Sequence, residues 1–198
     1  MENDAFPHRS GSFLKWVTHK PYDRRQLATA ITKNVSLADL FERLGDPPMN
    51  LRPTADGDDL AKHRYKTAEM FYPVRDFWPR DRISHLYYSA GMTAQFALSA
   101  HILKAGVPDS WCAARIGYLV AHSLAYANAT GLNHHCRRMA RLAAVLTPYW
   151  RWNAHSKFQY GHPDDPGFEP DEICSLLRGL LAKVRMTTGF ALIDNDLA

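Results

Sequence analysis

The chain has 198 residues, of which 46% are hydrophobic and 22% charged, and its formal net charge is +4. This length is enough for one domain with a buried core, and the composition excludes the disordered and fibrous classes of protein. The three cysteines, Cys112, Cys136 and Cys174, lie far apart and form no C-x-x-C pair. We therefore expect a single domain in a reducing, cytoplasmic compartment, without a disulfide framework or a cysteine zinc site.

The N-terminal part of the chain predicts an irregular arm followed by two short helices. Residues 1–22 form the arm, and the acidic residues among the first nine argue against a secretory signal. A first helix is expected over residues 24–33. A second is expected over residues 37–44, where Ser36 has the side chain of an N-cap and Gly45 is a typical helix stop. The prolines that follow predict a loop.

Three longer helices are predicted over residues 56–77, 81–104 and 108–130. The first of them ends early if Pro73 breaks it, and Pro108 is a favourable first-turn residue for the third. Two long stretches within these helices lack Lys, Arg, Asp and Glu, so each was compared with a membrane span. Their histidine and amide side chains are costly in lipid, which favours buried helices of a soluble bundle and no membrane partner.

The C-terminal part predicts two more helices, over residues 132–146 and 171–186. The first is amphipathic, and an aromatic and acidic loop over residues 153–170 separates the two. The alternation of apolar and polar residues that marks strands is missing throughout. The expected fold class is therefore all-α, an irregular bundle of six to seven helices.

Basic and aromatic residues are concentrated in one part of the chain, because residues 110–163 contain no Asp or Glu. Guanidinium groups suit phosphates and exposed rings suit bases, so this basic aromatic segment predicts a surface for nucleic acid or another polyanion. The candidate contacts are His134, Arg137, Arg138, Arg141, Trp150, Arg151, Trp152 and Lys157.

Two other interpretations of the basic aromatic segment stay open. In one, the arginines are merely solvated while Trp150, Trp152 and Phe158 close the end of the bundle, since aromatic residues are mostly buried. In the other, the acidic residues within 164–172 fold back on the basic helix face, or the acidic and basic residues form a dimer contact. Neither requires a nucleic acid.

An R-x4-H-x-Y pattern runs from Arg80 through His85 to Tyr87, at the predicted start of the 81–104 helix. Over these eight residues the chain resembles the motif of HEPN-type ribonucleases. The resemblance implies a dimer in which Arg80 and His85 act on the scissile phosphate without a metal. A helix N-terminus, an arginine and a histidine together suit phosphoryl transfer, although the same residues can simply open a helix.

Other signals of chemistry are missing from the sequence. It contains no H-E-x-x-H, Glu-x-x-His, G-x-S-x-G, phosphate-binding glycine loop or dinucleotide fingerprint. A lone histidine on an alanine-rich helix, such as His101 or His122, is more often packed than bound to metal. We therefore expect no cofactor and no metal site.

These observations favour a non-catalytic helical binding or regulatory protein whose basic aromatic face engages an anionic partner, nucleic acid in particular. The alternative is a metal-independent ribonuclease centred on Arg80, His85 and Tyr87. A third class is a protein–protein adaptor or inhibitor, monomeric or homodimeric, that uses the same aromatic residues. The exposure of Trp150, Trp152 and the Arg137 face discriminates among the three.

Overall fold

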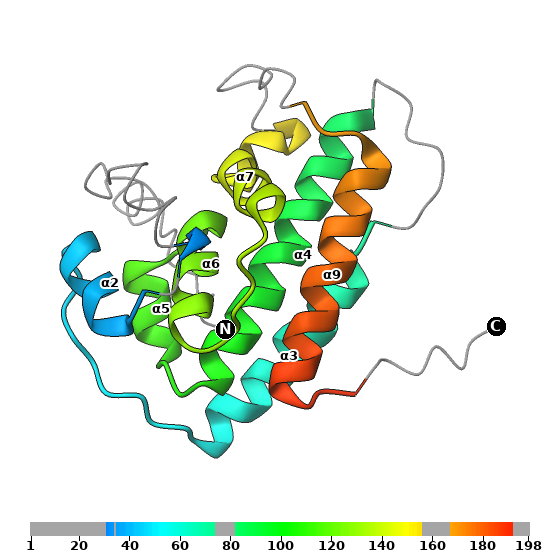
Figure 1. Cartoon of the computed structure of the whole chain (residues 1–198). Coiled ribbons are helices and arrows are strands. Elements are labelled where there is room, and N and C mark those ends of the chain that lie inside the picture. Colours follow the sequence, from blue (N-terminus) through cyan, green and yellow to red (C-terminus); the bar gives the residue numbers. More distant parts are fainter. Residues whose placement is uncertain (1–30, 34, 74–81, 156–166, 192–198) are drawn as a thin grey trace, which may run out of the picture.

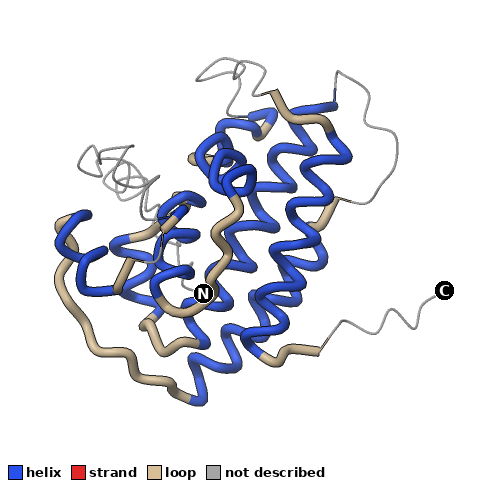
Figure 2. The backbone as a smooth tube through the Cα atoms, viewed as in Figure 1, coloured by secondary structure: helices blue, strands red, loops and turns tan. Residues whose placement is uncertain are grey.

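The computed structural model describes residues 31–33, 35–73, 82–155 and 167–191, and it confirms the expected all-α fold. Among these residues there are seven α-helices and no strand, and the helices form one compact bundle (Figure 1). Figure 2 shows that helices account for most of the described backbone, with short loops between them. The predicted arm over residues 1–22 and most of the predicted 24–33 helix lie outside the described residues.

The elements follow one another along the chain with a single 3-10 helix, η3, among them. They are α2 (Leu37–Leu44), α3 (Ala55–Phe71), α4 (Ile83–Lys104), α5 (Asp109–Arg115), α6 (Val120–Ala129), α7 (Arg137–Leu146), η3 (Tyr149–Trp152) and α9 (Pro170–Thr188). Local signals placed the ends of α2 correctly. The Ser36 side chain accepts a hydrogen bond from the backbone N–H of Asp39, and Gly45 ends the helix in the left-handed conformation.

Helix α4 is the centre of the bundle. Helices α3, α6 and α9 and the short η3 all pack against it, and 15 of its 22 residues are buried. Figure 1 shows α4 running the length of the molecule beside α9. Because neighbours surround it, α4 has no polar stripe, and its many Ala, Ser and Gly residues let the other helices come close. None of the helices in the described part of the chain combines the length and apolar character needed to cross a membrane.

Gly91 on α4 is the point where η3 comes closest to the central helix. A Cβ atom at this position would overlap the Cβ of Tyr149 and lie 2.8 Å from its Cγ. The hydrogen atom of glycine therefore makes the space into which the Tyr149 side chain packs. This contact fixes η3 against α4 and so sets the direction of its other side chains.

The predicted 108–130 helix is wrong in one respect, because the structure divides it into α5 and α6. Gly117 stands between them with a φ of 56°, in the left-handed region that favours glycine. The backbone carbonyl of Gly117 accepts a hydrogen bond from the Gln95 side chain at 3.1 Å, and Gln95 in turn accepts one from Ser123 at 3.1 Å. These tertiary bonds stabilise a turn that replaces the middle of the expected helix.

The predicted 132–146 helix begins later than expected, at Arg137. The preceding residues form a loop in which Asn133 has a φ of 53°. The buried Asn128 side chain holds this loop, because its Oδ1 accepts from the backbone N–H of His134 at 2.8 Å and its Nδ2 donates to the carbonyl of Ile31 at 3.0 Å. A hydrogen-bonded buried amide thus competes with the helix for the loop backbone. Near the other predicted boundaries, α3 ends at Phe71 before Pro73, and α9 extends to Thr188.

His101 is a buried titratable residue on α4. Its Nδ1 lies 3.1 Å from the hydroxyl of Thr187 on α9. Burial lowers the pKa of His101 from 6.5 to about 4, although nearby carbonyls of Thr130 and Ala127 partly oppose the shift. The native state therefore favours the neutral imidazole.

Replacing Gly91 with alanine should destabilise the protein. The added methyl group overlaps Tyr149, and overpacking of this kind costs about 1–3 kcal/mol, more than the ~1 kcal/mol that alanine gains over glycine in a helix. Urea unfolding measures the change. Gly179→Ala on α9, where no atom lies within 4 Å of the new Cβ, is the matched control and should be stabilising. A Gly91→Ala variant as stable as wild type would show that η3 does not depend on this contact.

The free energy of unfolding should fall as the pH decreases from about 6.5 to about 4. In that window the unfolded state binds a proton at His101 that the native state does not, so stability is complete above pH 6.5 and is lost towards pH 4, by up to about 3 kcal/mol. Urea unfolding at several pH values checks this. His101→Gln should flatten the profile, whereas His63→Gln, at an exposed position on α3, should keep it. Equal slopes in all three proteins would contradict the assignment.

Candidate functional site

The solvent-facing side of α7 carries the arginines that the sequence singled out. The opposite side of this helix is buried in the core through Met139, Ala140, Leu142, Ala143 and Leu146. Arg137 and Arg141 are exposed and stand one helical turn apart, so their Cβ atoms are about 6 Å from each other. Together with Arg138 they form what we call the basic face.

Part of the basic face is covered by the chain segment that leads into α9. The Arg138 and Arg141 guanidinium groups lie over the ring of Phe168, at 4.5 and 5.3 Å from its centroid. Arg138 also forms an ion pair with Glu172, in which its Nε donates to the carboxylate at 2.6 Å. The structure thus shows the fold-back of residues near the acidic run onto the basic helix. Arg138 is engaged within the chain, while Arg137 and Arg141 stay exposed.

The 3-10 geometry of η3 separates the two predicted tryptophans. Side chains three residues apart share a side of such a helix, so Tyr149 and Trp152 both point inwards. The Trp152 ring is only 4% exposed and stacks on Tyr87 of α4, with ring centroids 4.3 Å apart. A ring covered in this way is not available to a base. This placement corresponds to the interpretation in which Trp152 closes the end of the bundle.

Trp150 and Arg151 occupy the outer side of η3. Arg151 is exposed and Trp150 is half-buried, with its ring edge-to-face with Tyr118 at a centroid distance of 6.2 Å. Tyr118 is 54% exposed, and both rings contact Tyr149 beneath them. We call Tyr118 and Trp150 the aromatic platform. The sequence did not identify Tyr118, because it stands in the turn that was expected to be helical.

His134 has a structural position in the loop before α7. Its backbone is bonded to Asn128, and burial, followed by the charge of Lys183 and by His135, lowers the pKa of its half-buried imidazole. A neutral imidazole offers a phosphate less than a cation does. Lys157, the last of the predicted contacts, lies outside the described residues.

The structure places two of the three residues of the R-x4-H-x-Y motif. His85 is exposed in the first turn of α4. Tyr87 is 1% exposed, and its hydroxyl donates to the carbonyl of Phe168 at 3.4 Å. Arg80 is outside the described part of the chain. Since Tyr87 packs into the core, it is not available to a substrate, and the ribonuclease hypothesis depends on the other two residues.

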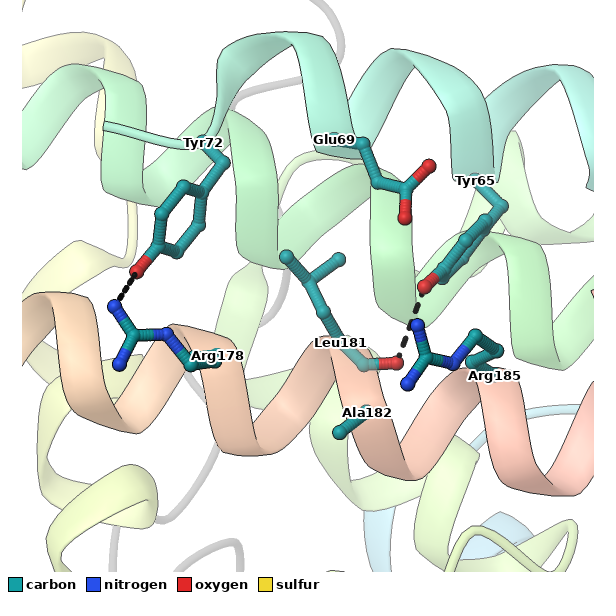
Figure 3. A pocket seen from close by; sticks show the side chains of 7 residues that line it. All are labelled: Tyr65, Glu69, Tyr72, Arg178, Leu181, Ala182 and Arg185. Carbon is teal, nitrogen blue, oxygen red and sulfur yellow. Dashed lines mark hydrogen bonds between the residues drawn. The ribbon is translucent and has the colours of Figure 1, made fainter. Parts of the chain in front are cut away.

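A pocket of about 230 Å³ lies between α3 and α9 (Figure 3). Tyrosine hydroxyls bridge the two helices here: Tyr65 donates to the carbonyl of Leu181 at 3.3 Å, and Tyr72 donates to that of Cys174 at 3.0 Å and accepts from Arg178. Burial and the Glu69 carboxylate raise the pKa of Tyr65. Both hydroxyls serve the contact between the helices. The lining is Tyr65, Glu69, Tyr72, Arg178, Leu181, Ala182 and Arg185.

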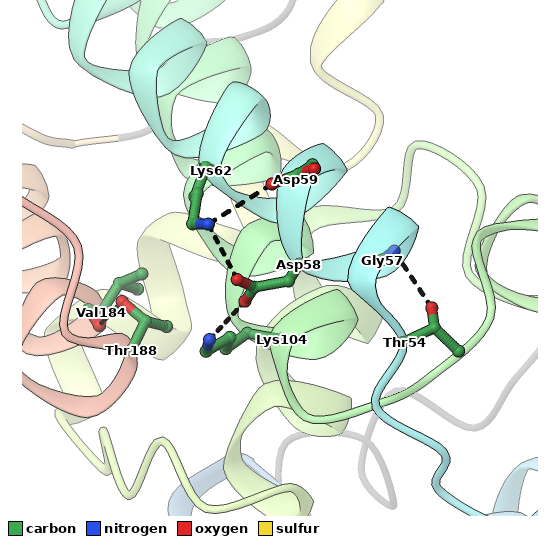
Figure 4. A network of polar contacts seen from close by, with 8 residues as sticks. All are labelled: Thr54, Gly57, Asp58, Asp59, Lys62, Lys104, Val184 and Thr188. Carbon is green, nitrogen blue, oxygen red and sulfur yellow. Dashed lines mark hydrogen bonds and ion pairs between the residues drawn. The ribbon is translucent and has the colours of Figure 1, made fainter.

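Several other basic side chains are neutralised inside the molecule. Figure 4 shows Asp58 at the start of α3 between Lys104 of α4 and Lys62, which lies 2.9 Å away. The hydrogen bond from Lys104, and then that from Lys62, holds the pKa of Asp58 below its usual value. Arg64 is likewise paired with Asp109 at 2.8 Å. These cations stabilise contacts between helices and are poor candidates for a polyanion surface.

Comparisons with known proteins found no match, whether to a protein-family model, to a curated protein or to a solved structure. Within the described ranges, no group of three or more His, Cys, Asp or Glu side chains is arranged to hold a metal ion. The candidates for function are therefore the basic face and the aromatic platform, on the strength of their own geometry.

Proposed function

We propose that the chain is a non-catalytic binding protein whose basic face engages a polyanion, with nucleic acid as the intended partner. The observation that carries the proposal is the exposure of Arg137 and Arg141, one turn apart on α7. The helix belongs to a stretch, residues 110–163, that contains no acidic residue. Two adjacent guanidinium groups without a nearby acid in their own segment suit successive phosphates.

The setting of the arginines supports this proposal. Arginine presents planar groups of N–H donors that match phosphate oxygens, and the aromatic ring of Phe168 beneath Arg138 and Arg141 stabilises them by a cation–π contact. A side chain held against a ring loses less conformational freedom when it binds. Since Lys62, Lys104 and Arg64 are paired elsewhere, the basic face is the stronger candidate for phosphate contacts.

Glu172 acts as an internal competitor for the same surface. Its carboxylate occupies the Arg138 guanidinium, which a phosphate would otherwise engage. The pair is partly exposed, so a polyanion with several phosphates can displace it at modest cost. The proposal therefore predicts binding that is weaker than the number of arginines suggests.

The two other classes of function stay predictions. A ribonuclease would have to use Arg80 and His85 without Tyr87, since Tyr87 is buried. An adaptor or inhibitor would use the aromatic platform for a protein instead of a nucleic acid. Neither is supported by an arrangement as specific as the two exposed arginines of α7.

Reversing the charges of Arg137 and Arg141 to glutamate should abolish binding to a fluorescent oligonucleotide. Each phosphate contact that is lost removes a counterion-release contribution, so the slope of log K against log salt should decrease by about two before binding disappears. Fluorescence anisotropy over a salt series measures both quantities. Thermal stability should stay close to wild type because both side chains are exposed.

The matched control for this double variant is Arg43→Glu with Lys66→Glu. These residues are exposed on α2 and α3, and the change in net charge is the same. The control should retain most of the affinity. Equal losses in the two double variants would show that net charge alone attracts the oligonucleotide, and no binding by the wild type would remove the proposal.

Replacing Glu172 with glutamine should strengthen binding of the same oligonucleotide by about fivefold, because a charge a few ångströms from a bound phosphate costs about 1 kcal/mol. Anisotropy titration at low salt measures the gain. Glu42→Gln, an equal change at an exposed position on α2, is the control and should leave the affinity nearly unchanged. If Glu172→Gln weakens binding, the ion pair positions Arg138 for the ligand instead of competing with it.

A further inference from the structure

The aromatic platform is an exposed pair of rings held in a fixed place. Tyr118 stands in the turn between α5 and α6, which the Gln95 side chain holds through the carbonyl of Gly117. Trp150 is held from below by Tyr149, whose side chain packs against Gly91. Rings anchored in this way are ordered before any ligand arrives, so little conformational entropy is lost on binding.

The geometry of the two rings suits one planar partner. Their planes are inclined at 76°, so a flat group stacked on one ring meets the edge or face of the other. Tyr118 is the more exposed ring and offers the stacking face. Aromatic side chains stack with every nucleobase because each base has a π-face, and contacts of this kind are typical of proteins that bind single strands.

The charge around the platform favours an anionic partner over an apolar one. Arg151 is exposed next to Trp150 on the outer side of η3. The turn that carries Tyr118 and the whole of η3 belong to residues 110–163, which contain no acidic residue. A ring pair beside a cation matches the base and the phosphate of one nucleotide.

The basic face and the aromatic platform are close enough for one short strand. From Arg141 the helix rises about 1.5 Å per residue to Leu146, and the four residues from there to Trp150 span at most ~3.6 Å each. The two residues are thus no more than ~22 Å apart along the chain, which about six stacked nucleotides cover at ~3.4 Å each.

We propose that Tyr118 and Trp150 stack a base of single-stranded nucleic acid whose phosphates lie on the basic face. This inference rests on the proposed function and narrows its ligand to single strands. In a duplex the bases are stacked and paired inside, so their faces are reached only at the cost of unstacking. The platform therefore distinguishes single strands from duplexes, whereas the arginines alone do not.

The test compares three probes on the full chain: fluorescent oligo(U) of about twelve nucleotides, a hairpin duplex RNA of similar charge, and heparin, which has no bases. Tyr118→Ala should weaken oligo(U) binding at least about fivefold and leave heparin and hairpin binding unchanged. Tyr118→Phe should retain the affinity, because the ring is kept. Met70→Ala, at a highly exposed apolar position on α3, is the control and should have no effect.

The outcomes separate this inference from the proposed function. If Arg137→Glu with Arg141→Glu abolishes binding but Tyr118→Ala does not weaken oligo(U), the proposed function stands and the platform does not bind bases. Equal losses for oligo(U) and heparin, or a change of oligomeric state in size-exclusion chromatography of Tyr118→Ala, would also overturn it, the latter because the platform then contacts a second copy. If wild-type protein binds none of the probes, both proposals are lost. Trp150→Phe and Trp150→Ala repeat the test on the second ring.

Discussion

The burial of α4 on nearly every side is the constraint on which the rest of the structure depends. A helix in that position cannot carry exposed charges, and its neighbours approach closely only where its side chains are small. Gly91 is the clearest case, because the space left by its missing side chain is filled by Tyr149. That one contact places η3, and the 3-10 geometry of η3 then directs Trp152 into the core and Trp150 outwards.

Where a helix begins and ends could be predicted from the sequence when the signals are local. The caps of α2 are formed by Ser36 and Gly45, and both are recognisable by residue type alone. The break between α5 and α6 was not predicted, because it depends on the side chain of Gln95 from another helix. The late start of α7 has the same origin in Asn128. Polar side chains buried by tertiary packing decide these boundaries, and sequence periodicity does not reveal them.

The candidate site was predicted in part for the same reason. The period of an α-helix was sufficient to place Arg137 and Arg141 on the exposed side of α7. It was not sufficient to separate Trp150 from Trp152, since the segment is a 3-10 helix with a different period. Tyr118 was missed because its exposure follows from the unexpected turn. The ion pair of Arg138 with Glu172 matches an interpretation that the sequence left open, and only the fold could select it.

The two proposed contacts have different neighbours and different physics, so their contributions to affinity should be separable. The basic face is supported by Phe168 and limited by Glu172, and its attraction for phosphates weakens as salt is added. The aromatic platform is supported by Tyr149, and stacking on its rings depends on the presence of bases. Contributions from sites that share no partner add. A ligand with phosphates and accessible bases gains from both surfaces, and this additivity would make the protein prefer single strands although no side chain reads a sequence.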